Sequence, residues 1–116
     1  MNYTDFRKQL LAECDNNNVL LLSHMGPDDD SIGSILATKY ALEQLTNATV
    51  TAAYQGDVPR RWEEFSGFDS ITFTDDLQVL VNKADTVVFI DGSELHRFSQ
   101  EELDISVPTF CIDHHP

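Results

Sequence analysis

Short, continuous runs of apolar and β-branched residues alternate along this chain with stretches of helical periodicity. Val19–Ser23 and Thr86–Ile90 are the clearest runs, and each has the length of one strand rather than of a helix. Uninterrupted apolar character is typical of strands that are buried on both faces of a parallel sheet. We therefore expect about five parallel strands, at residues 19–23, 49–54, 71–74, 86–90 and 109–112.

Apolar residues spaced three or four apart mark the helices between these runs. Phe6, Leu10 and Cys14 define the first helix, with Thr4 as its expected N-cap. Two further helices are expected over residues 32–45 and 75–84, a loop with one helical turn around Trp62 over 55–67, and a loop or short helix over 92–105. Strands that alternate with helices predict an α/β fold, a parallel sheet with helices on both faces.

Length and composition narrow the class of protein. A chain of 116 residues fits one domain. Its longest aliphatic run, Val19–Leu22, is far below the roughly 20 residues of a membrane span, so we expect a soluble protein without a membrane partner. No secretory leader opens the chain, and Cys14 and Cys111 lack a zinc-type spacing. We expect both as buried, reduced thiols of a cytoplasmic protein.

The net charge of −13 also limits the partners. Long nucleic acids bind basic surfaces, so we expect no long duplex DNA to bind. Scattered acids such as Glu63 and Glu101 are expected to serve solubility. Acids at the strand ends are instead candidates for holding cations, which would invert the local charge and admit an anionic substrate.

Acidic and histidine residues follow three of the expected strands, at the edge where a parallel sheet places its functional site. In strand order they are His24, Asp28 and Asp30; Asp91; and Asp113, His114 and His115. Several ionised carboxylates share a pocket only when cations neutralise them. Carboxylate oxygens with imidazole nitrogens suit manganese, with magnesium or iron as alternatives and zinc less favoured. Two ions roughly 3.5–4 Å apart would activate water and clamp a phosphate.

Each group alone has a simpler interpretation. His24 could be a hydrogen-bonded structural residue, and Asp28–Asp30 a solvated turn or a helix N-cap, with Asp30 as a candidate cap. Asp91 could belong to a turn after a strand, and the pair His114-His115 could be a tag remnant. Their conjunction at one sheet edge favours a metal site.

Three ordered motifs in this chain resemble those of the DHH-family phosphoesterases. His24 to Ser34 reads H-M-G-P-D-D-D-S-I-G-S and is similar to the first motif, H-x-x-P-D-x-D-x-x-G-S, at every defining position. Phe89-Ile90-Asp91 resembles the second motif, and Asp113-His114-His115-Pro116 the third. The order and spacing agree, and the resemblance spans essentially the whole chain.

The resemblance implies a role for each matching residue. One metal ion would be held by His24, Asp28 and Asp91, and a second by Asp30, Asp91 and His114, with Asp91 bridging. His115 would contact the substrate phosphate, and Asp113 would orient an imidazole. Gly33 and Ser34 would open the next helix, whose N-terminus faces the anion.

The same resemblance implies the activity and the domain. Within the family this chain is most similar to small cytoplasmic enzymes that degrade short oligoribonucleotides, dephosphorylate 3′-phosphoadenosine 5′-phosphate or open cyclic dinucleotides; exonucleases and inorganic pyrophosphatases of the superfamily remain alternatives. Residues 1–116 would form only the N-terminal part of the metal-binding domain. We expect a fourth motif and a C-terminal substrate domain to be missing, and the exposed sheet edge to favour a homodimer.

Three other classes compete with this interpretation. A haloacid-dehalogenase-type phosphatase would carry its aspartate directly on the strand end, whereas Asp28 lies five residues beyond Ser23. A receiver domain would want a lysine where Asp113 and His114 stand. The third alternative is a fragment that binds metal without catalysing a reaction.

Overall fold

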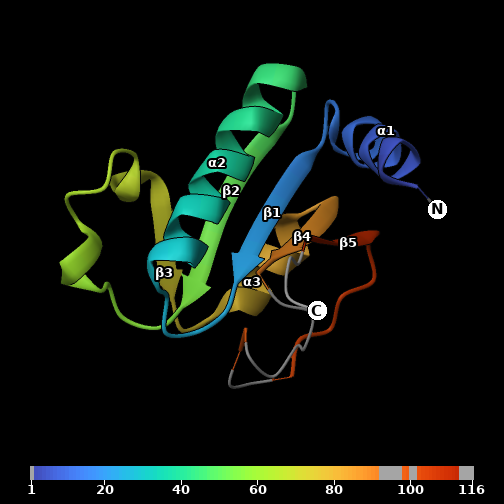
Figure 1. The fold of residues 1–116 in the computed structure, drawn as a ribbon. Coiled ribbons are helices and arrows are strands. Elements are labelled where there is room, and N and C mark those ends of the chain that lie inside the picture. The colour runs from blue at the N-terminus through green and yellow to red at the C-terminus, as the bar shows by residue number, and fades with distance from the viewer. Residues whose placement is uncertain (1, 92–97, 100–101, 113–116) are drawn as a thin grey trace.

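The computed structural model describes residues 2–91, 98–99 and 102–112. Within this part of the chain, five parallel strands form one sheet in the order β3-β2-β1-β4-β5 (Figure 1). In chain order the elements are α1 (Tyr3–Cys14), β1 (Asn18–Ser23), α2 (Asp29–Leu45), β2 (Thr49–Gln55), the 3-10 turns η1 (Arg60–Trp62) and η2 (Phe68–Ser70), β3 (Ile71–Thr74), α3 (Leu77–Lys83), β4 (Thr86–Ile90) and β5 (Thr109–Ile112).

The chain winds outward from a central strand in both directions. It runs from β1 through α2 to β2 and on to β3, then returns through α3 to β4 on the other side of β1 and continues to β5. The predicted α/β fold, with about five parallel strands and helices on both faces, is therefore confirmed. Among the described residues, no helix is long and apolar enough to cross a membrane.

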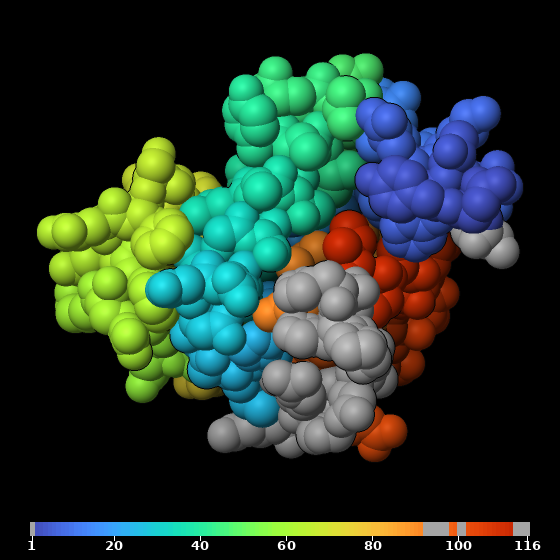
Figure 2. Space-filling model, in the orientation of Figure 1, coloured from blue at the N-terminus to red at the C-terminus, as the bar shows by residue number. Residues whose placement is uncertain are grey.

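Alternate residues of the central strands enter two separate cores. Val19 and Leu21 of β1 pack in the core that α1 and α2 cover, and Leu20 and Leu22 pack in the core that α3 covers. All four side chains are at most 2% exposed. This explains the solid apolar run of β1, since neither face of the strand meets water. Figure 2 shows the blue α1 beside the green and cyan α2, with which it is in contact.

Side-chain caps mark where α1 and α2 begin. The Asn2 carboxamide oxygen accepts the Asp5 N–H at 2.9 Å, and α1 begins at Tyr3. The prediction of Thr4 as N-cap was therefore wrong, because Thr4 already lies in the first turn. The N-cap of α2 is Asp28. Asp30, the candidate cap, lies inside that helix.

The edge of the sheet differs from its centre. Side chains of β5 alternate between exposed and half-buried, and Cys111 is exposed. The prediction that both cysteines are buried was thus wrong for Cys111, because an edge strand has one face that its neighbours cover incompletely. Cys14 is fully buried, and burial raises its pKa to about 11.

The long connection after β2 contains the helical turn predicted at Trp62, observed as η1, and a second turn, η2. The segment 92–105 lies partly outside the described residues. Within its described part, Phe98 and Leu103 are buried in the core beneath α3.

Candidate metal centre

The strand order creates a switch point between β1 and β4. From β1 the chain proceeds to one side of the sheet through β2, and from β4 it proceeds to the other side through β5. At the carboxyl ends of the two strands, Ser23 lies opposite Ile90. A parallel sheet leaves a crevice for ligands at such a point, beyond the strand ends. The residues that follow are His24 and Asp91.

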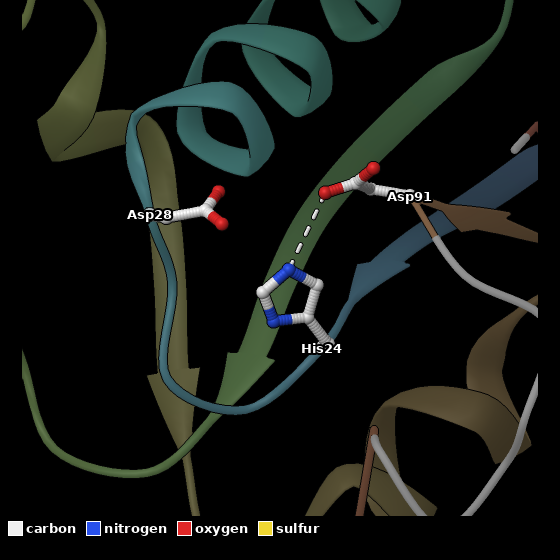
Figure 3. Close-up of side chains that lie close together, drawn as sticks. All are labelled: His24, Asp28 and Asp91. Carbon is white, nitrogen blue, oxygen red and sulfur yellow. Dashed lines mark ion pairs between the residues drawn. The ribbon is translucent and has the colours of Figure 1, made fainter. Parts of the chain in front are cut away.

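Three side chains converge beyond these strand ends. One ligand atom from each of His24, Asp28 and Asp91 lies within 4.8 Å of the other two. The His24 Nε2 atom is 3.3 Å from Asp91 Oδ2, and both residues are buried. In Figure 3, His24 and Asp91 point toward one another, and Asp28 points toward them from the start of α2. Residues separated by more than sixty positions in the sequence therefore form one polar cluster.

The ring of His24 is oriented by a hydrogen bond of its second nitrogen, Nδ1. Its Nδ1 atom lies 3.0 Å from the Met25 carbonyl oxygen. Since a carbonyl only accepts, Nδ1 carries the proton in this contact. Nε2 then faces the Asp91 carboxylate. In the imidazolium form Nε2 would donate a proton to this carboxylate in a hydrogen bond, and in the neutral form Nε2 carries a lone pair. The second form is the one that ligates metals, and a backbone carbonyl on the far nitrogen is a frequent partner of metal-binding histidines.

Asp28 is fixed by a reciprocal capping box. Its Oδ1 atom accepts the Ser31 backbone N–H at 2.8 Å, and the Ser31 hydroxyl accepts the Asp28 backbone N–H at 3.0 Å. The Ser31 N–H holds the pKa of Asp28 below its usual value, and this effect outweighs the opposing effect of burial. Asp28 is accordingly held as a carboxylate with one oxygen at the helix terminus.

The backbones of His24 and Asp91 are anchored through their neighbours. The hydroxyl of Ser23 donates to the Ile90 carbonyl at 2.9 Å, which ties the last residues of β1 and β4 together. The Asp91 N–H donates to the Ile112 carbonyl of β5 at 2.8 Å. Asp91 has a φ of 64°, a left-handed conformation that aspartate and asparagine adopt more readily than most residues.

A buried tyrosine forms a hydrogen bond with Ser31, the residue that holds Asp28. Tyr54 of β2 is fully buried, and its hydroxyl donates to the Ser31 hydroxyl at 3.2 Å. Burial raises the pKa of Tyr54 to about 12, so the phenol stays protonated and remains a donor. The Ser31 hydroxyl in turn donates to the Asp28 carbonyl at 3.1 Å. Tyr54 thus helps to hold the turn that presents Asp28.

The other predicted site residues lie elsewhere. Asp30 is exposed, outside the three-residue cluster, and lines a groove beside it. Gly33 and Ser34 lie in the second turn of α2, which begins at Asp29 rather than at these residues. A Cβ atom on Gly33 would meet nothing within 4 Å. The predicted residues Asp113, His114 and His115 lie outside the described residues.

Three residues around the cluster were not predicted from the sequence: Ser23, Ser31 and Tyr54. Ser31 carried only a partial signal, because it lies three positions after an aspartate that could cap the following helix, where the usual capping box has Glu or Gln. Ser23 and Tyr54 carried none, since their roles depend on which strands become neighbours in the sheet.

The donor set fits a divalent metal ion. It offers one imidazole nitrogen and two carboxylates, a combination that manganese, magnesium and iron accept. Opposite ligands of a six-coordinate ion with bonds of about 2.1 Å lie about 4.2 Å apart. The separations of at most 4.8 Å are therefore close to those of a loaded site. His24, Asp28 and Asp91 could hold one such ion with small side-chain movements.

Comparison with known proteins supports the fold. No family model and no curated protein matches the sequence. A solved structure described as an exopolyphosphatase-related protein from Bacteroides fragilis superposes with a TM-score of 0.78 at 20% sequence identity. The match covers 97% of this chain and 35% of the other, so the chain spans about a third of that protein's length. At this identity the similarity establishes a shared fold.

Proposed function

We propose that this chain is the metal-binding domain of a phosphoesterase that hydrolyses phosphodiester or phosphomonoester bonds of short nucleotides. The observation that carries the proposal is the convergence of His24, Asp28 and Asp91 at the β1/β4 switch point. Two further features support it: the motif resemblance to DHH-family enzymes, and the shared fold with a protein whose name refers to a phosphatase of polyphosphate.

Each residue of the cluster has a defined task in this proposal. His24 presents Nε2 as a ligand because Met25 holds its other nitrogen. Asp28 supplies a carboxylate that the helix terminus keeps ionised, and Asp91 supplies one from the deepest position. The expected second ion would use Asp91 again, together with Asp30 and His114. When bound, two manganese ions would activate water for attack on phosphorus and offset the charge of the phosphate.

The charge of the chain favours small substrates. With a net charge of −13, the surface repels long polyanions, whereas a short nucleotide needs only the local positive potential of bound cations. Hydrolysis of a phosphoanhydride, as in polyphosphate or pyrophosphate, is the second candidate, and the name of the structural neighbour favours testing it.

Metal binding tests the foundation of the proposal. At a manganese concentration of one hundred times Kd, a single site should stabilise the folded chain by about 2.7 kcal/mol. Asp91→Asn should lose most of this gain, and asparagine also tolerates the left-handed backbone of position 91. Thermal unfolding with and without manganese measures both quantities. Equal stabilisation of wild type and Asp91→Asn would refute the site.

Turnover tests the activity itself. Purified protein with manganese is incubated with a 5′-phosphorylated dinucleotide, 3′-phosphoadenosine 5′-phosphate or pyrophosphate, and released phosphate and nucleotide are quantified. We expect at most slow hydrolysis of an ester by wild type, because the substrate domain is expected to be missing, and none by Asp91→Asn. Cleavage of pyrophosphate alone would favour the second candidate. Manganese binding with no turnover of any substrate would show that the chain alone is an inert metal-binding fragment.

A further inference from the structure

A groove of about 330 Å³ adjoins the metal cluster. One wall is the loop and helix start that contain Asp28, and the opposite wall is η1, with Arg61 and Trp62. Figure 2 shows the segment of residues 56–70 beside the start of α2. Asp28 belongs to both the cluster and the groove, so the two sites share one carboxylate.

Trp62 forms a fixed part of the groove wall. Its side chain is only 9% exposed, and its Nε1–H donates to the Pro27 carbonyl at 3.3 Å. The ring of Phe65 packs edge-on against it, with centroids 5.8 Å apart. Pro27 directly precedes Asp28, so the hydrogen bond joins η1 to the loop that presents the candidate metal ligand.

Arg61 lies on the face of this tryptophan. Its guanidinium carbon is 4.5 Å from the centroid of the Trp62 ring, within the range of a cation–π interaction. The neighbouring Arg60 pairs with Glu63 at 3.7 Å. Arg61, in contrast, forms no ion pair with any residue of the described chain, although three aspartates line the same groove. A guanidinium stacked on a ring keeps its N–H edge available for two parallel hydrogen bonds.

We propose that Arg61 binds a second phosphate of the substrate, next to the phosphate that undergoes hydrolysis. Arginine matches the geometry of phosphate oxygens through paired hydrogen bonds. Among the described residues, Arg61 is the one lysine or arginine that lines this groove. This inference rests on the proposed function and adds a substrate preference: compounds with two neighbouring phosphates bind more tightly than monophosphates.

The aspartates of the groove determine when this binding occurs. Asp28, Asp29 and Asp30 repel a phosphate as long as their charges are not offset. Cations at the cluster would offset part of that charge, and the arginine then supplies the remaining attraction. Binding of the second phosphate should therefore depend both on metal and on Arg61.

The experiment uses methylenediphosphonate, a diphosphate analogue that resists hydrolysis, beside orthophosphate as the single-phosphate probe. Affinities are measured by calorimetry with manganese present, and the emission of Trp62, the single tryptophan of the chain, reports whether the ligand occupies the groove. Arg61→Ala should weaken diphosphonate binding at least about tenfold, the effect of losing a charge-assisted contact. It should leave the orthophosphate affinity unchanged.

Arg60→Ala is the matched control, because it removes the same charge from the adjacent position and should bind both probes as wild type does. Equal losses in the two variants, or a wild type that prefers neither probe, would overturn the assignment of Arg61. The proposed function is judged separately. If wild type hydrolyses an ester but Arg61→Ala and Arg60→Ala bind diphosphonate equally well, the proposed function stands and the phosphate site at Arg61 is rejected. If only Arg61→Ala loses diphosphonate binding and wild type hydrolyses none of the substrates, the phosphate site stands and hydrolysis by this chain is rejected.

Discussion

Asp28 combines two tasks in one carboxylate. One oxygen caps α2 through the Ser31 N–H, and the side chain also contributes to the cluster with His24 and Asp91. A carboxylate has about four acceptor positions on its two oxygens, so the tasks do not exclude one another. The helix cap keeps the side chain in place in the metal-free protein. The arrangement reduces the entropy that must be lost when a metal ion binds.

Substitutions of Asp28 should separate the two tasks. Asparagine caps helices about as well as aspartate, so Asp28→Asn should leave the unfolding free energy of the metal-free protein nearly unchanged, whereas Asp28→Ala should lower it by about 1 kcal/mol. Both variants should lose most of the stabilisation by manganese. Urea unfolding with and without manganese measures these effects. A metal-free Asp28→Asn as unstable as Asp28→Ala would contradict the capping role.

The same carboxylate predicts a dependence on pH. The folded-state pKa of Asp28 is lowered, so its contribution to stability is fully present above the unfolded pKa and is lost as the pH falls through the folded value. Metal-free wild type should therefore lose stability relative to Asp28→Asn as the pH is lowered below about 4, the range of an ordinary aspartate. Unfolding curves of the two proteins across this range provide the measurement. A constant difference between them would show that Asp28 gains nothing from the Ser31 N–H.

At the scale of the elements, the centre depends on how strand ends are joined. The Ser23 hydroxyl links β1 to β4, the Asp91 N–H links β4 to β5, and Tyr54 links β2 to the first turn of α2. Each link is one hydrogen bond between segments that are distant in the sequence. Together they fix the three positions from which the cluster side chains project.

Tyr54→Phe tests the link from β2. The substitution keeps the ring and its stacking on Phe73, at a centroid distance of 5.4 Å, and removes only the hydroxyl. Loss of one buried hydrogen bond should lower the unfolding free energy by about 1 kcal/mol. Because Ser31 then holds Asp28 less firmly, manganese affinity should also fall, which calorimetry measures. Unchanged metal affinity at reduced stability would limit Tyr54 to a role in the core. Phe73→Leu is a suitable control, since it disturbs the same packing without touching the hydrogen bond.

Strands were easier to predict from the sequence than helix ends. The strands at residues 71–74, 86–90 and 109–112 were predicted with the bounds that the structure shows, because each is a short run of apolar and β-branched residues between polar segments. The starts of α1 and α2 depend instead on one side-chain hydrogen bond each, and two polar residues near each start could form it. Thr4 and Asn2, or Asp30 and Asp28, therefore remain ambiguous until the backbone is known.

The candidate site could be predicted in part, from the rule that the carboxyl ends of parallel strands lie at the same edge of a sheet. That rule placed His24, Asp28 and Asp91 near one another, but it does not state strand order, and strand order decides which ends are adjacent. Cys111 illustrates the same limit, since the apolar run of β5 resembles a central strand although it lies at the edge. Arg61 and Trp62 come from a loop whose path no local pattern specifies. Ring contacts and one backbone carbonyl fix it instead.

For the whole molecule, the fold brings acidic side chains together, whereas the negative charges of these side chains repel one another. The sheet gathers carboxylates at the switch point, in a chain that already carries a net charge of −13. Self-repulsion of this kind destabilises a compact state. Any cation will relieve part of it, through general screening or through occupation of the cluster. The two contributions must be separated before stabilisation by a metal can be attributed to the site.

Ionic strength separates them. Raising sodium chloride from about 0.01 M to about 0.1 M shortens the Debye length from about 30 Å to about 10 Å and screens charges over the whole surface. Wild type and Asp91→Asn should therefore gain similar stability, because one residue among 20 acids changes little of the total repulsion. Manganese added at the higher salt concentration should then stabilise wild type alone, since the remaining effect requires His24, Asp28 and Asp91 together. Melting temperatures across both titrations provide the measurement, and magnesium serves as a second divalent ion of equal charge. If both divalent ions stabilise wild type and Asp91→Asn equally, the acids of this chain act as a diffuse negative surface, and the convergence at the strand ends holds no metal.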